Sequence, residues 1–127
     1  MKRSWAPVVL LVAAVALSCG NSGRQLQSIS ISQTLSGQQI QFIATGHFSG
    51  MPTTVTPLPV SWGIGPFAPP PPSLTYTLTM QPFVFDCTVS NSSLPVSVVA
   101  PSNPHAPMTG SLPFHDMVTG EAPIQCP

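Results

Sequence analysis

Hydrophobic and polar residues alternate with a period of two along the chain from Leu26 onward, in short segments bounded by glycine and proline. This alternation is typical of strands, because successive side chains of a strand point to opposite faces of the sheet. Two early segments show it, 28–32 (SISIS) and 39–45 (QIQFIAT), and the turn residues Ser36 and Gly37 separate them. We expect these segments to form the first two strands.

The same period continues in the later part of the chain. Val60, Trp62 and Ile64 share one phase, and the segment 74–80 alternates apolar residues with threonines that form a polar face. Three further segments place apolar residues in phase: Phe83, Phe85, Cys87 and Val89; Val96 and Val98; Ala122, Ile124 and Cys126. The 17 prolines disfavour long helices, since an interior proline costs about 3 kcal/mol there. The sequence therefore predicts an all-β domain over residues 26–127.

Two stretches interrupt this pattern and are expected to be loops. Residues 66–72 (PFAPPPP) form a proline cluster, which is typical of a stiff polyproline II segment between strands. Residues 101–113 (PSNPHAPMTGSLP) are long, polar and rich in turn residues.

The N-terminus has the layout of a secretory signal. Lys2 and Arg3 are followed by an uncharged apolar stretch over residues 5–17 and by small residues before Cys19. This stretch is too short to span a bilayer comfortably, since spanning takes roughly 20 residues. We predict that residues 1–18 are a signal peptide that is removed.

Residues 15–19 (VALSC) resemble the lipobox of bacterial lipoproteins. The resemblance implies that Cys19 becomes the mature N-terminus and carries acyl chains such as palmitate, which anchor the protein at the cell envelope. Gly20 is not the aspartate that retains some lipoproteins at the inner membrane, which favours the outer membrane. Ala16 replaces the usual leucine, so an ordinary signal peptide cut nearby stays the alternative. Residues 19–25 are small and polar, and we expect a flexible spacer there.

Charge excludes one class of partner. After residue 18 the chain has one cation, Arg24, and three anions, Asp86, Asp116 and Glu121. Without a basic patch it cannot neutralise phosphates along a strand, which excludes nucleic acid as a partner. Membrane contact is expected through the lipid anchor.

Two cysteines remain once Cys19 is assigned to the anchor. Cys87 and Cys126 both fall in the apolar phase of their segments, and an exported chain matures in an oxidising compartment. We predict that they form a disulfide. Closing a loop of about 39 residues would stabilise the domain by on the order of 4 kcal/mol.

The first half of the domain resembles the group 2 bacterial immunoglobulin-like domains. The matching positions are Leu26, Ile29, Ile31, Gly37, Gln41, Phe42, Ala44, Thr45, Gly46, Phe48, Val60, Ser61 and Trp62. The resemblance implies an immunoglobulin-like β-sandwich with Trp62 in the core of the third strand. The second half departs from the family pattern, so the resemblance predicts no strand order there.

No catalytic or metal-binding motif is present. His47, His105 and His115 are far apart in sequence, and neither HExxH nor a zinc-type cysteine spacing occurs. A triad of His115, Asp86 and a serine is conceivable, but there is no nucleophile elbow to position the serine. We therefore expect no enzymatic activity, no metal and no cofactor.

The leading hypothesis is a membrane-tethered interaction or structural domain of the cell envelope, with a protein or glycan ligand that the sequence does not identify. The alternative is a lipoprotein that binds a carbohydrate or another small ligand. In that alternative, the aromatic residues Tyr76, Phe67 and Phe114 would form an exposed stacking platform.

Overall fold

Nine strands and one short 3-10 helix make up the regular structure of residues 23–88 and 93–127, which the computed structural model describes. The elements are β1 (Leu26–Ser36), β2 (Gln39–Phe48), β3 (Thr54–Val55), β4 (Ser61–Ile64), β5 (Ser73–Thr77), β6 (Phe83–Asp86), β7 (Val96–Pro101), β8 (Thr109–Pro113), η1 (Phe114–Asp116) and β9 (Met117–Ala122). The predicted signal peptide, Cys19 and Val89 lie outside the described residues. The predicted all-β fold is confirmed.

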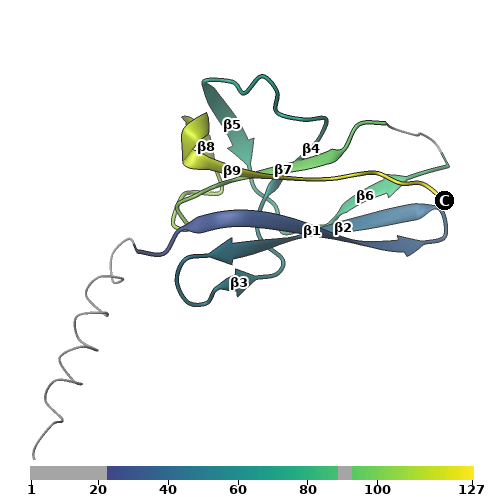
Figure 1. The fold of residues 1–127 in the computed structure, drawn as a ribbon, viewed down its shortest axis with the longest axis horizontal. Helices are drawn as coiled ribbons and strands as arrows, with labels where there is room; N and C mark the ends of the chain where they lie inside the picture. Colours follow the sequence, from purple (N-terminus) through teal and green to yellow (C-terminus); the bar gives the residue numbers. More distant parts are fainter. Residues whose placement is uncertain (1–22, 89–92) are drawn as a thin grey trace, which may run out of the picture.

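The strands form two sheets that pack face to face, with a third, smaller sheet beside them (Figure 1). The first sheet contains β1, β2, β3 and β6, where β3 and β6 pair with opposite ends of β2. The second has the order β4-β7-β9, and β5 pairs with β8 in the third. All pairings between these strands are antiparallel. The molecule is therefore an all-β sandwich with an additional two-stranded sheet formed by β5 and β8.

The hairpin of β1 and β2 follows the predicted alternation. Ser36 pairs with Gln39 across a two-residue turn, and Gly37 in that turn has a φ of 63°, which glycine adopts without strain. The apolar positions of the family resemblance point inward, because they fall on the face that meets the second sheet: Leu26, Ile29, Phe42, Ala44 and Phe48 are buried.

β7 is the central strand of the domain, and all six of its residues are buried. One of its faces points between the two main sheets, where Val96, Val98 and Ala100 join the core. On the other face, Val99 packs against Tyr76 of β5. The hydroxyl of Ser97, also on this strand, donates a hydrogen bond to the carbonyl of Gly65, which satisfies its buried polar group.

The predicted disulfide between Cys87 and Cys126 is present, with 5.8 Å between the two Cα atoms. Both side chains are partly buried and pack against the cluster around Phe42. Cys87 follows β6, and its N–H donates to the carbonyl of Gln38 at 2.8 Å. The bridge therefore ties the C-terminal segment to the first sheet near its hairpin turn.

Trp62 packs against both clusters of the core between the main sheets, where the resemblance places it, but it is not fully buried. It lies on β4 and is half-buried, while Val60 takes the fully buried position beside it. Its ring stacks on Phe83 with centroids 5.7 Å apart, and its Nε1–H donates to the carbonyl of Gln81 at 3.2 Å. The indole thus closes the edge of the sandwich, because its N–H needs a partner that the apolar interior lacks.

Three predicted boundaries differ from the structure. The segment 101–113, expected to be a loop, contains β8, which pairs with β5 through Thr109–Pro113. The strand expected over 74–80 ends at Thr77. The last strand ends at Ala122, yet Ile124 is still buried. The predicted inward orientation of Ile124 is therefore correct, although this residue is no longer part of a strand.

β9 approaches β1 closely at Gly120. A β carbon added there would lie 2.7 Å from the carbonyl oxygen of Ile29 and 3.2 Å from a methyl group of Val98. Because the nearer atom belongs to the backbone, β1 would have to shift. We expect Gly120→Ala to lower the free energy of unfolding by about 1–3 kcal/mol, measured by chemical denaturation.

Gly63→Ala is the matched control for this prediction. Gly63 also lies in a strand, β4, but a β carbon added there would have no atom within 4 Å. Alanine restricts the unfolded chain more than glycine does, so we expect unchanged stability or a gain of up to about 1 kcal/mol. Equal losses for the two variants would contradict the close contact at Gly120.

Candidate functional site

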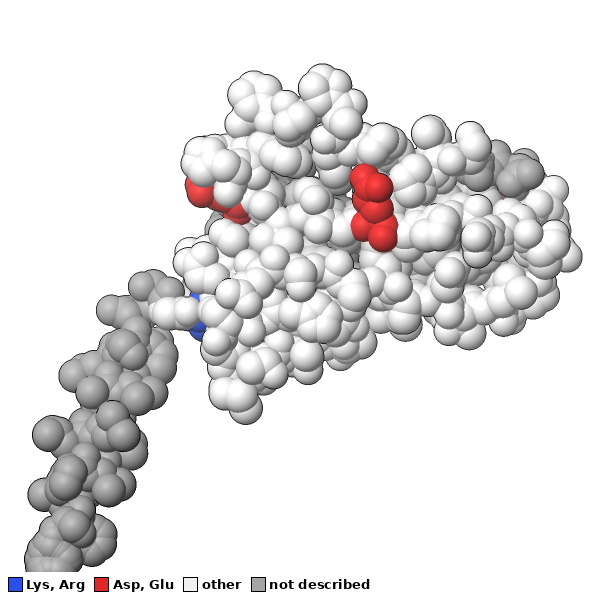
Figure 2. Space-filling view, in the orientation of Figure 1, with Lys and Arg blue, Asp and Glu red and all other residues white. Residues whose placement is uncertain are grey.

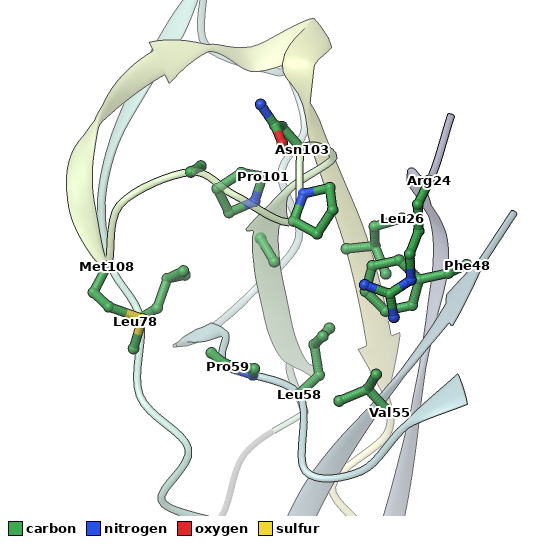
Figure 3. A pocket seen from close by; sticks show the side chains of 13 residues that line it. Arg24, Leu26, Phe48, Val55, Leu58, Pro59, Leu78, Pro101, Asn103 and Met108 are labelled. Atoms are coloured by element: carbon green, nitrogen blue, oxygen red, sulfur yellow. The ribbon is translucent and has the colours of Figure 1, made fainter. Parts of the chain in front are cut away.

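An apolar cavity lies at the end of the sandwich where β1 begins (Figure 3). Its volume is about 190 Å³. The walls come from the start of β1, the ends of β2 and β7, β3, and the segments that follow β3, β5 and β7. The lining residues are Arg24, Leu26, Phe48, Val55, Leu58, Pro59, Leu78, Ala100, Pro101, Asn103, Pro104, Ala106 and Met108. Most of these side chains are aliphatic or proline, so the cavity suits an apolar group.

The size of the cavity limits what it can hold. Pockets for drug-sized ligands are typically about 300–1,000 Å³, and this cavity is smaller. Arg24 and Asn103 are the polar side chains in its wall. The arrangement fits a single apolar side chain or the end of an acyl chain, with a cation at the rim, better than it fits a sugar.

Arg24 is held firmly at this rim. Its guanidinium lies over the ring of Phe48, 3.9 Å from the ring centroid, a cation–π geometry. Nη2 donates to the carbonyl of Pro52 at 2.9 Å, and Nε donates to the carbonyl of Gly50 at 3.4 Å. The backbone N–H of Gln25 donates to the Ser49 hydroxyl at 3.0 Å.

These contacts move the predicted start of the domain. Arg24 and Gln25 were expected to belong to a flexible spacer, but both bind the loop that follows β2. The sequence pattern indicates only the charge of Arg24, because its partners lie in a loop more than 25 residues away. A lone arginine just before the first strand is the signal that could have indicated it.

The three aromatic residues of the predicted stacking platform do not form one. Tyr76 is only 2% exposed, and its hydroxyl donates to the carbonyl of Pro107 at 3.0 Å. Phe67 and Phe114 are half-buried and contact each other, with ring centroids 5.7 Å apart and planes at 50°. Tyr76 is buried because β5 packs on β7, so this route to sugar binding has no flat, exposed surface.

The structure does not bring His115 and Asp86 together. His115, whose side chain is 81% exposed, lies in η1, and its Nε2 is 3.5 Å from Oδ1 of its neighbour Asp116. Asp86 lies in β6, toward the opposite end of the sandwich (Figure 1). The triad considered for these residues is therefore not assembled.

Asp86 has a local role instead. Its Oδ1 accepts hydrogen bonds from the Thr88 hydroxyl at 2.7 Å and from the Thr88 N–H at 2.9 Å. The Thr88 hydroxyl, followed by the Thr88 N–H, lowers the pKa of the Asp86 carboxyl, because both stabilise its charged form. This is the geometry of an Asx turn that ends β6.

Charged side chains are sparse over the molecule. Figure 2 shows one face, on which nearly every atom belongs to residues other than Lys, Arg, Asp and Glu. Arg24 is the only Lys or Arg among residues 23–88 and 93–127. In the same residues, no group of three or more His, Cys, Asp or Glu side chains could hold a metal ion.

Comparison with protein-family models, curated proteins and solved structures found no match to this chain. The interpretation of the site therefore depends on the residues of the chain itself.

Within the part of the chain that the structure describes, there is no helix with the length and apolar character needed to cross a membrane.

Proposed function

We propose that this chain is a lipoprotein of the bacterial cell envelope, anchored through acyl chains on Cys19, whose sandwich is an interaction or structural domain. The observation that carries the proposal is the lipobox-like segment 15–19 (VALSC) at the end of an apolar stretch. Residues 23–25 already contact the loop that follows β2, where the Gly23 carbonyl accepts a hydrogen bond from the Ser49 hydroxyl at 2.9 Å, so an acylated Cys19 would hold the domain close to the membrane.

The strand order supports an immunoglobulin-like domain. Immunoglobulin sandwiches of the constant type place strands A, B, E and D in one sheet and strands C, F and G in the other. Within the described residues, no strand takes the place of D beside β6. Here β1, β2 and β6 share the first sheet, and β4, β7 and β9 share the second, in the corresponding chain order. The pair β5 and β8 is an addition to that pattern, and it covers the outer face of the second sheet.

Two further features agree with export. The disulfide requires an oxidising compartment to form and persist. The nearly uncharged surface would favour association of a free protein, and attachment to a membrane limits that association. A domain of this kind would bind a protein partner through its exposed loops or sheet faces. Within the described residues, the burial of Tyr76 weakens the alternative of a sugar-stacking platform.

Intact mass of the protein recovered from membranes of an expressing bacterium tests the proposal. We expect a mass that lacks residues 1–18, includes acyl groups, and rises by two hydrogen atoms on reduction. A Cys19→Ala variant should carry no acyl mass. An unacylated parent protein in the soluble fraction would contradict the anchor, whatever its disulfide state.

A further inference from the structure

We propose that one end of the sandwich rests on the phospholipid surface of the membrane that holds the anchor. We call it the Arg24 end; it comprises Arg24, the loop 49–53 and the loop 102–108. The inference depends on the proposed lipid anchor and adds which part of the domain contacts lipid. Three features support it: the position of the anchor, the exposed apolar side chains, and the placement of Arg24, the only Lys or Arg in the part of the chain that the structure describes.

The length of the linker limits where the domain can lie. Cys19 and Arg24 are five residues apart, and an extended chain covers at most about 17 Å over that length. The Arg24 end must therefore stay near the membrane surface. β1 rises about 3.4 Å per residue, so Leu35 at the other end of this strand lies about 30 Å from Leu26.

The Arg24 end presents apolar side chains to its surroundings. Among the described residues, Met51 is the most exposed large hydrophobic residue, at 80%, and Met108 is 49% exposed. Leu35 and Val84, toward the other end, are 55% and 50% exposed, so the linker decides which end meets lipid. The hydrogen bonds from Arg24 to the carbonyls of Gly50 and Pro52 fix the loop on both sides of Met51. Met108 lines the apolar cavity that also has Arg24 in its wall.

This combination matches the boundary between lipid headgroups and acyl chains. Met51 and Met108 can enter the apolar side of that boundary, where the cavity can receive part of an acyl chain. The guanidinium of Arg24 has five N–H groups. Within the described residues, one on Nε and one on Nη2 donate to the carbonyls of Gly50 and Pro52. Its planar geometry suits a lipid phosphate.

The carboxylates of the chain restrict the role of long-range attraction. Asp86 pairs with Gln39 beside the far hairpin turn, and Glu121 pairs with Ser97 within the second sheet. Asp116 lies toward the Arg24 end, because its carbonyl accepts the N–H of Ser102. Arg24 and Asp116 carry opposite charges at the same end of the domain, so this end has no net charge that would attract anionic lipid over a distance. Lipid contact then depends on the two methionines and on one arginine–phosphate pair.

Such a contact would be too weak to recruit a free protein. The anchor makes it intramolecular, with an effective concentration on the order of millimolar for a short linker. A few apolar atoms and one charged hydrogen bond are then enough to orient the domain.

Tryptophan variants of the mature lipoprotein, reconstituted into phosphatidylethanolamine–phosphatidylglycerol vesicles, test the orientation. Met51→Trp places the probe at the Arg24 end, and Leu35→Trp is the matched control at the other end of β1. The parent protein, with Trp62 as its one tryptophan after residue 18, supplies the background. Brominated lipid should quench the Met51→Trp signal about twofold, because side chains at such interfaces lie about 5–10 Å deep. The Leu35→Trp signal should not change.

Adding Arg24→Gln should reduce the quenching of Met51→Trp. Hydrogen exchange of the amides of residues 49–51 and 53 in the parent protein, slower in vesicles than in detergent, gives a second measurement that needs no substitution. Equal quenching of the two tryptophan probes would overturn the proposed orientation and leave the lipid anchor standing. The same conclusion would follow if Met51→Trp showed no quenching and hydrogen exchange of the loop 49–53 were the same in vesicles and in detergent. Protein that does not float with the vesicles would overturn the lipid anchor and this inference together.

Discussion

Reduction of the Cys87–Cys126 disulfide is expected to lower the free energy of unfolding by about 4 kcal/mol. The bridge joins residues 39 positions apart, and a cross-link of that span removes conformational entropy from the unfolded chain. Domains of this size are stable by roughly 5–15 kcal/mol, so the loss is a large share of the total. Urea unfolding with and without reductant measures it.

The double variant Cys87→Ala/Cys126→Ala is the control for this prediction. It removes both thiols, which pack against the cluster around Phe42, without leaving a free cysteine in the domain. Its unfolding midpoint should resemble that of the reduced parent and should not respond to reductant. A parent midpoint that is the same in both conditions would show that the bridge does not stabilise the domain.

Phe42→Ala is expected to lower the free energy of unfolding by about 3–5 kcal/mol, since it removes a fully buried ring and leaves a cavity. Phe42 lies on β2 opposite Phe83 of β6, with ring centroids 6.2 Å apart. It also belongs to the cluster that includes Ile40 and Val96. Chemical denaturation at fixed pH measures the change.

Phe67→Ala makes the same chemical change at a half-buried position in the proline-rich loop. It removes less buried area, so its cost should be clearly smaller than that of Phe42→Ala. Similar losses for the two variants would mean that the cluster between the main sheets does not dominate stability.

The hydrophobic pattern predicts strands well where one face is wet. β1 and β2 alternate because one side of their sheet meets the core and the other meets solvent. β7 is covered on both faces, so its VSVVAP sequence carries no clear alternation. The sequence does not indicate β8, because its TGSLP sequence follows the loop 102–108 and has few strand-favouring residues. Its pairing with β5 comes from tertiary contact.

The candidate site was less predictable than the fold. The cavity has walls from segments that are distant in sequence, such as Arg24, Leu58 and Met108, and no local pattern joins them. Tyr76 was correctly placed in an apolar phase, but only the packing of β5 on β7 shows that its ring is unavailable to a ligand. The disulfide was predictable because the assignment of Cys19 to the anchor leaves two of the three cysteines, and these allow one pairing.

The position of the disulfide has a mechanical consequence. A pulling force applied at Cys126 passes through the covalent bridge to Cys87 and so to the end of β6, while the anchor that we propose would hold the chain before the start of β1. β6 and β1 both pair with β2, and the hydrogen bonds of antiparallel strands run across the strand direction. Tension along this path would therefore shear the β1–β2 and β2–β6 pairings, and the hydrogen bonds of each pairing would resist together instead of opening one after another.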